Sequence, residues 1–267
     1  MQPDIYDIFE LFANNLADAS GKILRDMFQN GAKTINVEQK ADLSPVTAAD
    51  RAVEQLLRQT IEQNFPTHGI VGEEFGNARE TAEYKWVLDP IDGTKSFIAG
   101  YPIFTTIISL LHNDVPVLGI IDQPILRERW LGVAGKGTFY NGAQLPALKN
   151  HKTLAQANIA TTSTPYFSAD EAEFFKNLSA KSNSTILGGD AYAYAMLASG
   201  RIDAVIDSGM KPYDFCALAP IVAGVCGVIT DFSGDPLTQH SNGKIIASAN
   251  AGLHKEILKN VCALTKL

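Results

Sequence analysis

Lys85-Trp-Val-Leu-Asp89-Pro-Ile-Asp92-Gly-Thr94 contains a short apolar run that ends in carboxyl side chains. The run is too brief for a helix and is typical of a buried strand. A second such run, Gly69-Ile-Val-Gly72, is followed at once by Glu73. Because acids follow both predicted strands, we expect Glu73, Asp89 and Asp92 to converge at one place.

Three carboxyl groups within a few ångströms of one another repel unless some are protonated or a cation lies among them. Clustered oxygen ligands suit hard divalent ions such as Mg²⁺. Pro90 restricts the backbone between the aspartates, and the amides of Gly93 and Thr94 are placed to receive an anion. The pattern therefore predicts a metal ion and a phosphate group at this turn. Asp-Pro and Asp-Gly are also ordinary turn dipeptides, and this alternative stays open on these residues alone.

Residues 1–150 are expected to form an N-terminal α+β half. Apolar residues recur at three- and four-residue intervals from Ile5 to Met27, which indicates a long amphipathic helix. A second helix is expected from Thr47, with Asp50 as the acid of a capping box, to a residue before Pro66. Turn residues then separate β-rich runs that predict an antiparallel meander: Thr105–Leu111, Val115–Ile121, Arg129–Ala134 and Gly137–Tyr140.

Residues 151–267 predict a C-terminal α/β half, because short β-rich runs alternate with helical stretches. The expected strands are Ala157–Thr161, Thr185–Leu187, Ala204–Ile206, Val228–Asp231 and Lys244–Ala247. The expected helices are Ala169–Leu178, Ala191–Ser199, Phe215–Ala223 and Gly252–Leu264. No Pro/Gly/Ser-rich linker separates the halves, so we expect a shared interface whose cleft is the natural place for a site.

Composition argues against several classes of protein. With 267 residues, 46% of them hydrophobic and 19% charged, the chain has the averages of a globular protein rather than a disordered one. A net charge of −7 argues against a nucleic-acid partner, since phosphate backbones attract clustered Lys and Arg. No apolar run reaches the about 20 residues of a membrane span, and the N-terminal acids are unlike a signal peptide. The three cysteines show no CxxC spacing, so we expect a reduced, cytoplasmic compartment.

Three motifs resemble those of the inositol monophosphatase family: Gly72-Glu73-Glu74, the run from Trp86 to Thr94, and Pro212-Tyr213-Asp214 before an Ala/Gly-rich helix. The resemblance covers nearly the whole chain. It implies a layered αβαβα sandwich, of α+β or α/β class, and a phosphomonoesterase that uses two or three Mg²⁺ ions, with Mn²⁺ as an alternative ion. It also implies a small-molecule phosphate ester as substrate and a homodimer.

The resemblance also implies a role for individual residues. The metal ligands would be Glu73, Asp89, the carbonyl of Ile91, Asp92 and Asp214. Asp89 would bridge two ions. Thr94, hydrogen-bonded to Asp50, would act with Glu73 to orient and deprotonate a water molecule for in-line attack. Asp50 has a second interpretation as the acid of its capping box, and the two roles can coexist.

Within that family, separated segments resemble the histidinol-phosphate phosphatases: Phe97-Ile98-Ala99-Gly100, Ile121-Asp122-Gln123-Pro124, the run from Gly188 to Tyr194, and Lys211 to Leu218, where Tyr213 replaces a tryptophan. The substrate contacts implied are Asp92, Gly93, Thr94, Gly189, Asp190 and Asp207. Histidinol carries an amine and an imidazole that can be cationic, which carboxylates would recognise. Asp190 and Asp207 can also be interpreted as a helix N-cap and a strand-end acid.

Two further hypotheses stay open on the sequence. The first is a broader, inositol-1-monophosphatase-like activity. Comparing the turnover of histidinol phosphate with that of inositol 1-phosphate would distinguish it from a histidinol-phosphate phosphatase. The second is a non-catalytic binding module with the same fold. The intact carboxyl set argues against the second hypothesis, because a protein without activity has no physical need to keep like charges together.

Overall fold

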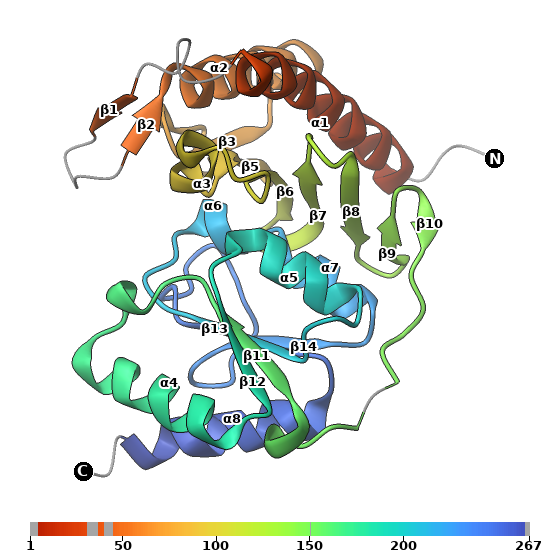
Figure 1. Cartoon of the computed structure of the whole chain (residues 1–267). Coiled ribbons are helices and arrows are strands. Elements are labelled where there is room, and N and C mark those ends of the chain that lie inside the picture. Colours follow the sequence, from red (N-terminus) through yellow and green to blue (C-terminus); the bar gives the residue numbers. More distant parts are fainter. Residues whose placement is uncertain (1–4, 31–36, 40–44, 150, 265–267) are drawn as a thin grey trace.

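Helical and sheet layers alternate through the molecule (Figure 1). The computed structural model describes residues 5–30, 37–39, 45–149 and 151–264. Helices cover the outer faces of two sheets, and a further helical layer lies between the sheets. This order confirms the expected αβαβα sandwich.

The first helical layer consists of α1 (Ile5–Gln29) and α2 (Ala48–Asn64). Both helices pack on the large sheet through buried side chains that recur every three or four residues, which is why periodicity located them. These side chains are Phe9, Ala13, Leu16, Ser20 and Leu24 on α1 and Val53, Leu57 and Ile61 on α2. The expected capping box at Thr47 is present. A short antiparallel pair, β1 (Val37–Gln39) and β2 (Pro45–Thr47), precedes α2 and was not predicted.

The large sheet has eight strands in the order β10-β9-β8-β7-β6-β5-β3-β4. Neighbouring strands are antiparallel except for β3 and β5, which are parallel. The expected meander is confirmed in β6 to β9. The strand bounds are β3 Gly69–Gly72, β4 Gly76–Ala78, β5 Tyr84–Asp92, β6 Thr105–His112, β7 Val115–Gln123, β8 Glu128–Val133, β9 Gly137–Tyr140 and β10 Ala143–Gln144.

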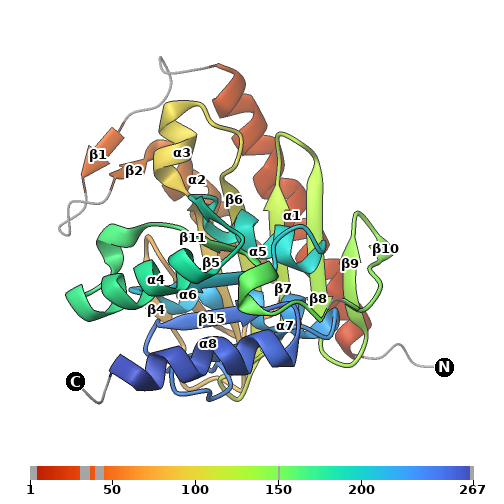
Figure 2. The ribbon, with the colours of Figure 1, turned by 60° about the horizontal axis from the view of Figure 1, so that its bottom comes forward.

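The second sheet has five strands in the order β12-β11-β13-β15-β14. Strands β12, β11 and β13 are parallel, whereas β15 is antiparallel to β13 and β14. Figure 2 shows α8 in front of β15 in this sheet, and α4 lies on the same outer layer. The bounds are β11 Asn158–Thr161, β12 Ser184–Leu187, β13 Ala204–Asp207, β14 Val228–Asp231, β15 Ile245–Ser248, α4 Ala169–Lys181 and α8 Ala251–Leu264.

The middle layer consists of α5 (Asp190–Ala198), α6 (Pro212–Phe215) and α7 (Leu218–Gly224). The helix expected over Phe215–Ala223 is present as α7, but it begins three residues later than expected, at Leu218, and the separate short helix α6 ends at Phe215. The core around this layer joins side chains from both sides of residue 150, such as Trp130 and Tyr194, and the division into halves stays a prediction.

Short elements complete the described part of the chain: α3 Thr94–Ala99, η2 Leu154–Gln156 and η3 Thr164–Tyr166. None of them was predicted, because each is too short for a periodic signal. In the described ranges, we find no helix with the length and apolar character needed to cross a bilayer.

Glycines let the middle layer approach the large sheet closely. A Cβ on Gly119 of β7 would lie 2.1 Å from the carbonyl oxygen of Ala217, and one on Gly132 of β8 would lie 2.4 Å from the amide nitrogen of Ile221. Both clashes involve backbone atoms, which cannot rotate away as a side chain can. The segment from Ala217 to Ile221 can therefore pack here only against residues that lack a side chain.

We expect Gly119→Ala to lower the free energy of unfolding by about 1–3 kcal/mol, because the added methyl group overpacks this contact. Urea denaturation followed by circular dichroism measures the change. Gly252→Ala is the matched control, since Gly252 is exposed on the first turn of α8. An equal loss in both variants would show that the close approach to α7 is not the cause.

Candidate active site

The carboxyl end of β5 brings two aspartates to one place through an irregularity in the strand. Side chains alternate between the faces of a regular strand, so residues three apart would face opposite ways. The register with β6 shifts between Asp89 and Asp92, which is the mark of a β-bulge. Thr106 Oγ1 donates to the carbonyl of Pro90 at 2.9 Å, and Thr105 Oγ1 donates to Asp92 Oδ2 at 3.3 Å. These bonds hold the bulge against β6.

The third aspartate, Asp214, lies on the short helix α6 far along the chain. Its Oδ2 accepts a hydrogen bond of 2.6 Å from the Lys211 amide at the start of this helix. One carboxyl oxygen from each of Asp89, Asp92 and Asp214 lies within 4.8 Å of the others. Asp89 is buried and the other two are partly buried. The expected meeting of Asp89 and Asp92 is therefore present, Asp214, which only the resemblance added, joins them, and Glu73 is not one of this group of three.

Burial and mutual repulsion change how these acids ionise. Burial raises the pKa of Asp89 well above its ordinary value, and the neighbouring acids Glu73, Asp92 and Asp214 raise it further. Burial likewise raises the pKa of Asp92 well above its ordinary value, and repulsion from the nearby carboxyl group of Asp190 is the next largest cause of this rise. The pKa of Asp214 rises to about 7, mainly through burial. Without a cation, the group can keep its geometry only by holding protons.

The donor set fits a hard divalent cation. Asp89 Oδ1 is buried and has no hydrogen-bond partner within the described residues, which leaves a lone pair available inside the cluster. Glu73 comes directly after β3 and lines a cavity together with Asp89, Asp92 and Asp214. Its amide donates to the carbonyl of Leu88 at 3.2 Å. Carboxylate and carbonyl oxygens are the ligands that Mg²⁺ prefers, and their negative charge calls for such an ion.

Thr94 lies between Asp50 and the turn after β5. Its Oγ1 is 3.1 Å from the carbonyl oxygen of Ile91 and 3.5 Å from Asp50 Oδ1. Asp50 also accepts hydrogen bonds from the amide and the hydroxyl of Thr47, at 2.7 and 2.6 Å. Burial raises the pKa of Asp50 to about 6, although the bonds from Thr47 act in the opposite direction. Both interpretations of Asp50, as a helix cap and as a partner of Thr94, are thus present in one geometry.

Most of the site residues predicted from the sequence line one cavity of 390 Å³. The predicted residues on its wall are Glu73, Asp89, Ile91, Asp92, Gly93, Thr94, Asp190, Asp207 and Asp214. Asp50 lies behind Thr94 and is not part of the wall. Gly189 is also not part of the wall; it has a φ of 105° and forms the left-handed start of α5, and its contact with a substrate stays a prediction.

Asp190 is held in a conformation that only a few residue types adopt. Its φ is 45°, and its carboxyl group lies so close to Gly93 that a Cβ there would come within 2.8 Å of Asp190 Oδ2. The next amide, of Ala191, donates to Asp92 Oδ2 at 2.6 Å. Burial raises the pKa of Asp190, whereas the nearby Lys95 lowers it. The start of α5 therefore places a carboxyl group directly over the turn at Gly93.

Asp207 lies at the end of β13 and is already engaged within the protein. Its carboxyl oxygens accept hydrogen bonds from Thr161 Oγ1 at 2.9 Å, from the Thr162 amide at 2.7 Å and from Tyr194 Oη at 2.9 Å. Burial raises its pKa to about 6. These bonds favour a supporting role in the cavity wall, and direct contact between Asp207 and a substrate stays a prediction.

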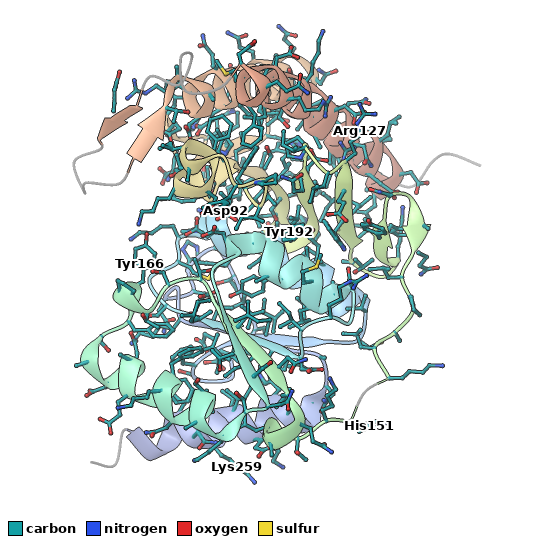
Figure 3. All side chains as sticks on the ribbon, in the orientation of Figure 1. Asp92, Arg127, His151, Tyr166, Tyr192 and Lys259 are labelled. Carbon is teal, nitrogen blue, oxygen red and sulfur yellow. The ribbon has the colours of Figure 1, made fainter. Side chains whose placement is uncertain are left out.

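Sequence reasoning missed a contact at the rim of the cavity. Lys95 Nζ lies 3.4 Å from Tyr166 Oη and 5.5 Å from the centre of the Tyr166 ring. Figure 3 shows Asp92 and Tyr166 on the same side of the molecule, between the large sheet and the second sheet. A lysine directly after Gly93-Thr94 was a signal that could have been used, whereas no local pattern marks Tyr166.

We expect metal-free protein to lose stability as the pH rises from about 4 to about 7, because Asp214 has an ordinary pKa of 3.8 when unfolded and about 7 when folded. A raised folded pKa means that the folded state binds more protons in this window, so unfolding becomes easier as they leave. Thermal melts in EDTA across this range measure the effect. Asp214→Asn keeps an acceptor for the Lys211 amide and should show a shallower decline, and an identical decline would contradict the assignment.

Comparisons with known proteins agree with this geometry. The model of the inositol monophosphatase family matches residues 7–266. The chloroplastic bifunctional phosphatase IMPL2 of Arabidopsis thaliana is 42% identical over 96% of this chain and 75% of its own length. A histidinol-phosphatase of Mycobacterium tuberculosis is 32% identical over 95% of this chain and 97% of its own length.

A solved structure extends the likeness to three dimensions. An inositol monophosphatase from Zymomonas mobilis superposes with a TM-score of 0.87 at 40% identity, covering 97% of this chain and 99% of that one. The match of sequence and fold runs through the strands and helices that carry the carboxyl cluster. The chain belongs to the inositol monophosphatase family.

Proposed function

We propose that this protein is a Mg²⁺-dependent phosphomonoesterase. The observation that carries the proposal is the approach of carboxyl oxygens from Asp89, Asp92 and Asp214 to within 4.8 Å beside the Gly93-Thr94 turn. The residues that would hold two or three metal ions, with Mn²⁺ as an alternative, are Glu73, Asp89, the carbonyl of Ile91, Asp92 and Asp214. Divalent ions supply Lewis-acid stabilisation of a phosphoryl group and a water of lowered pKa when they are bound.

The chain's own residues would bind the phosphate and handle the proton. The amides of Gly93 and Thr94 would donate to the phosphate oxygens, because the left-handed Gly93 starts α3 with its first amides unpaired by the helix. Thr94 would orient the attacking water through its hydroxyl. Asp50 and Glu73 would accept the proton released from water. A pKa of about 6 suits Asp50 to proton transfer near neutral pH.

For the substrate we propose L-histidinol phosphate, hydrolysed to L-histidinol and phosphate as a step of histidine biosynthesis. Asp190 supports this substrate, because its carboxyl group lies beside Gly93 and would attract a cationic group on the same molecule. The histidinol-phosphatase of Mycobacterium tuberculosis, a relative along nearly its full length, supports it too.

The second candidate is an inositol-1-monophosphatase or a phosphatase of broader range. The likeness to the Zymomonas mobilis inositol monophosphatase favours this candidate. A non-catalytic binding module is the remaining alternative. The cluster of carboxyl groups argues against it, since a protein without activity has no physical need to keep like charges together.

We further propose a homodimer in the cytoplasm, with no nucleic-acid or membrane partner. The exposed Ile186 and Leu187 on the edge strand β12 support self-association, because exposed apolar side chains on an edge strand favour a protein partner. The net charge of −7 is unfavourable for contact with phosphate backbones.

A panel of small phosphomonoesters tests the function. We expect phosphate release from histidinol phosphate in Mg²⁺, no release in excess EDTA, and recovery when Mg²⁺ is restored, because the carboxyl cluster needs a counter-charge. Faster turnover of inositol 1-phosphate would favour the second candidate. Full activity in EDTA would contradict the metal assignment, and inactivity on every ester in Mg²⁺ would favour the binding module.

A second test concerns specificity. We expect Asp190→Asn to lower kcat/KM for histidinol phosphate by roughly 10- to 150-fold, since a charge-assisted hydrogen bond is worth about 1.5–3 kcal/mol. An uncharged phosphomonoester should lose far less. Asp170→Asn, on the exposed first turn of α4, is the control and should leave both rates unchanged. Equal losses on both esters would assign Asp190 to the phosphate site or to folding instead.

A further inference from the structure

A three-residue hairpin loop between β3 and β4 carries Glu73, and none of its amides is left to solvent. The amide of Glu73 donates to the carbonyl of Leu88 at 3.2 Å. The amide of Glu74 donates to Glu54 Oε2 at 2.7 Å, and the amide of Phe75 donates to Glu54 Oε1 at 3.1 Å. One side chain of α2 therefore binds two successive amides of the loop that presents Glu73 to the cavity.

Glu54 is fixed in turn by a neighbour on its own helix. Its side chain is fully buried, whereas that of Arg58 is 14% exposed. Arg58 Nε donates to Glu54 Oε1 at 2.7 Å, and Arg58 Nη2 donates to the carbonyl of Gly76 just beyond the loop. A buried carboxyl group keeps its place only when such donors satisfy it. Glu54 thus binds two amides within the loop, and Arg58 binds a carbonyl at its end.

The approach of Glu54 to the loop requires a glycine at position 72. A Cβ on Gly72 would lie 2.0 Å from Glu54 Oε1 and 2.5 Å from Arg58 Nη2. The Gly-Glu pair at the end of β3 therefore has two separate purposes. The glutamate faces the cavity, and the glycine leaves room for the carboxyl group behind it.

We propose that Glu54 is a positioning residue that holds Glu73 in the geometry a metal ion requires. The inference rests on the proposed metal site. Rotation of the loop would leave the buried oxygens of Glu54 without their amide donors, so the backbone that carries Glu73 is held in one orientation. Residues that orient metal ligands in this way are typically worth 10- to 100-fold in metal affinity when substituted.

Glu54→Gln tests the proposal, because its amide NH₂ group would face a backbone N–H group in place of an acceptor oxygen. We expect the Kd for Mg²⁺, measured by titration calorimetry on the whole protein, to rise about 10- to 100-fold. The kcat at saturating Mg²⁺ should change much less than the affinity. Glu62→Gln is the control: Glu62 lies on the same helix with its side chain 50% exposed, and the Kd should not change.

Circular dichroism in EDTA separates positioning from folding. A variant Glu54→Gln that is folded at the titration temperature and binds Mg²⁺ as tightly as the wild type overturns the proposal, even if its melting temperature is lower.

Should that variant fail to fold, Arg58→Gln leaves both amide bonds to Glu54 in place, and it removes the guanidinium partner of Glu54 together with the bond from Arg58 to the Gly76 carbonyl. It should raise the Kd in the same direction by a smaller factor, and an unchanged Kd overturns the proposal. A wild-type protein that does not bind Mg²⁺ overturns the proposed function itself, and this inference with it.

Discussion

Repulsion among buried carboxyl groups at the end of β5 is the constraint on which the rest of the structure depends. Backbone donors from two helices of the middle layer offset it: the Ala191 amide binds Asp92, and the Lys211 amide binds Asp214, each at 2.6 Å. Charge at the start of a helix is stabilised by its unpaired amides. The middle layer of the sandwich therefore does more than fill the core, because it brings the start of α5, and Asp214 on α6, to the acids of the large sheet.

That delivery depends on small residues at the sheet surface. The segment after Asp214 packs where Gly119 and Gly132 expose the strand backbone, and a methyl group at either position would collide with that segment. The position of Asp214 is thus set by the packing of the residues that follow it on the large sheet, as well as by its hydrogen bond from the Lys211 amide. The geometry of the acids therefore depends on the close contact between the two layers.

Much of this architecture could be predicted from the sequence, since periodicity marks the long helices and turn residues mark the meander. The meeting of Asp89 and Asp92 was also expected, yet regular alternation would have separated them. Its cause is the bulge against β6, a property of strand pairing that one strand's sequence does not record. Asp207 shows the same limit, because its donors Thr161 and Tyr194 come from distant segments that meet it only in the folded chain.

Glu54 shows why the remaining part of the site escaped prediction. With Arg58 four residues later it resembles an ordinary surface ion pair of a helix, and only tertiary structure reveals its contact with the loop of Glu73. Asp50 precedes it by one turn, so α2 reaches Thr94 and that loop from the same face. Because the buried side chains of α2 seat it on the large sheet, both parts of the site take their position from one rigid helix.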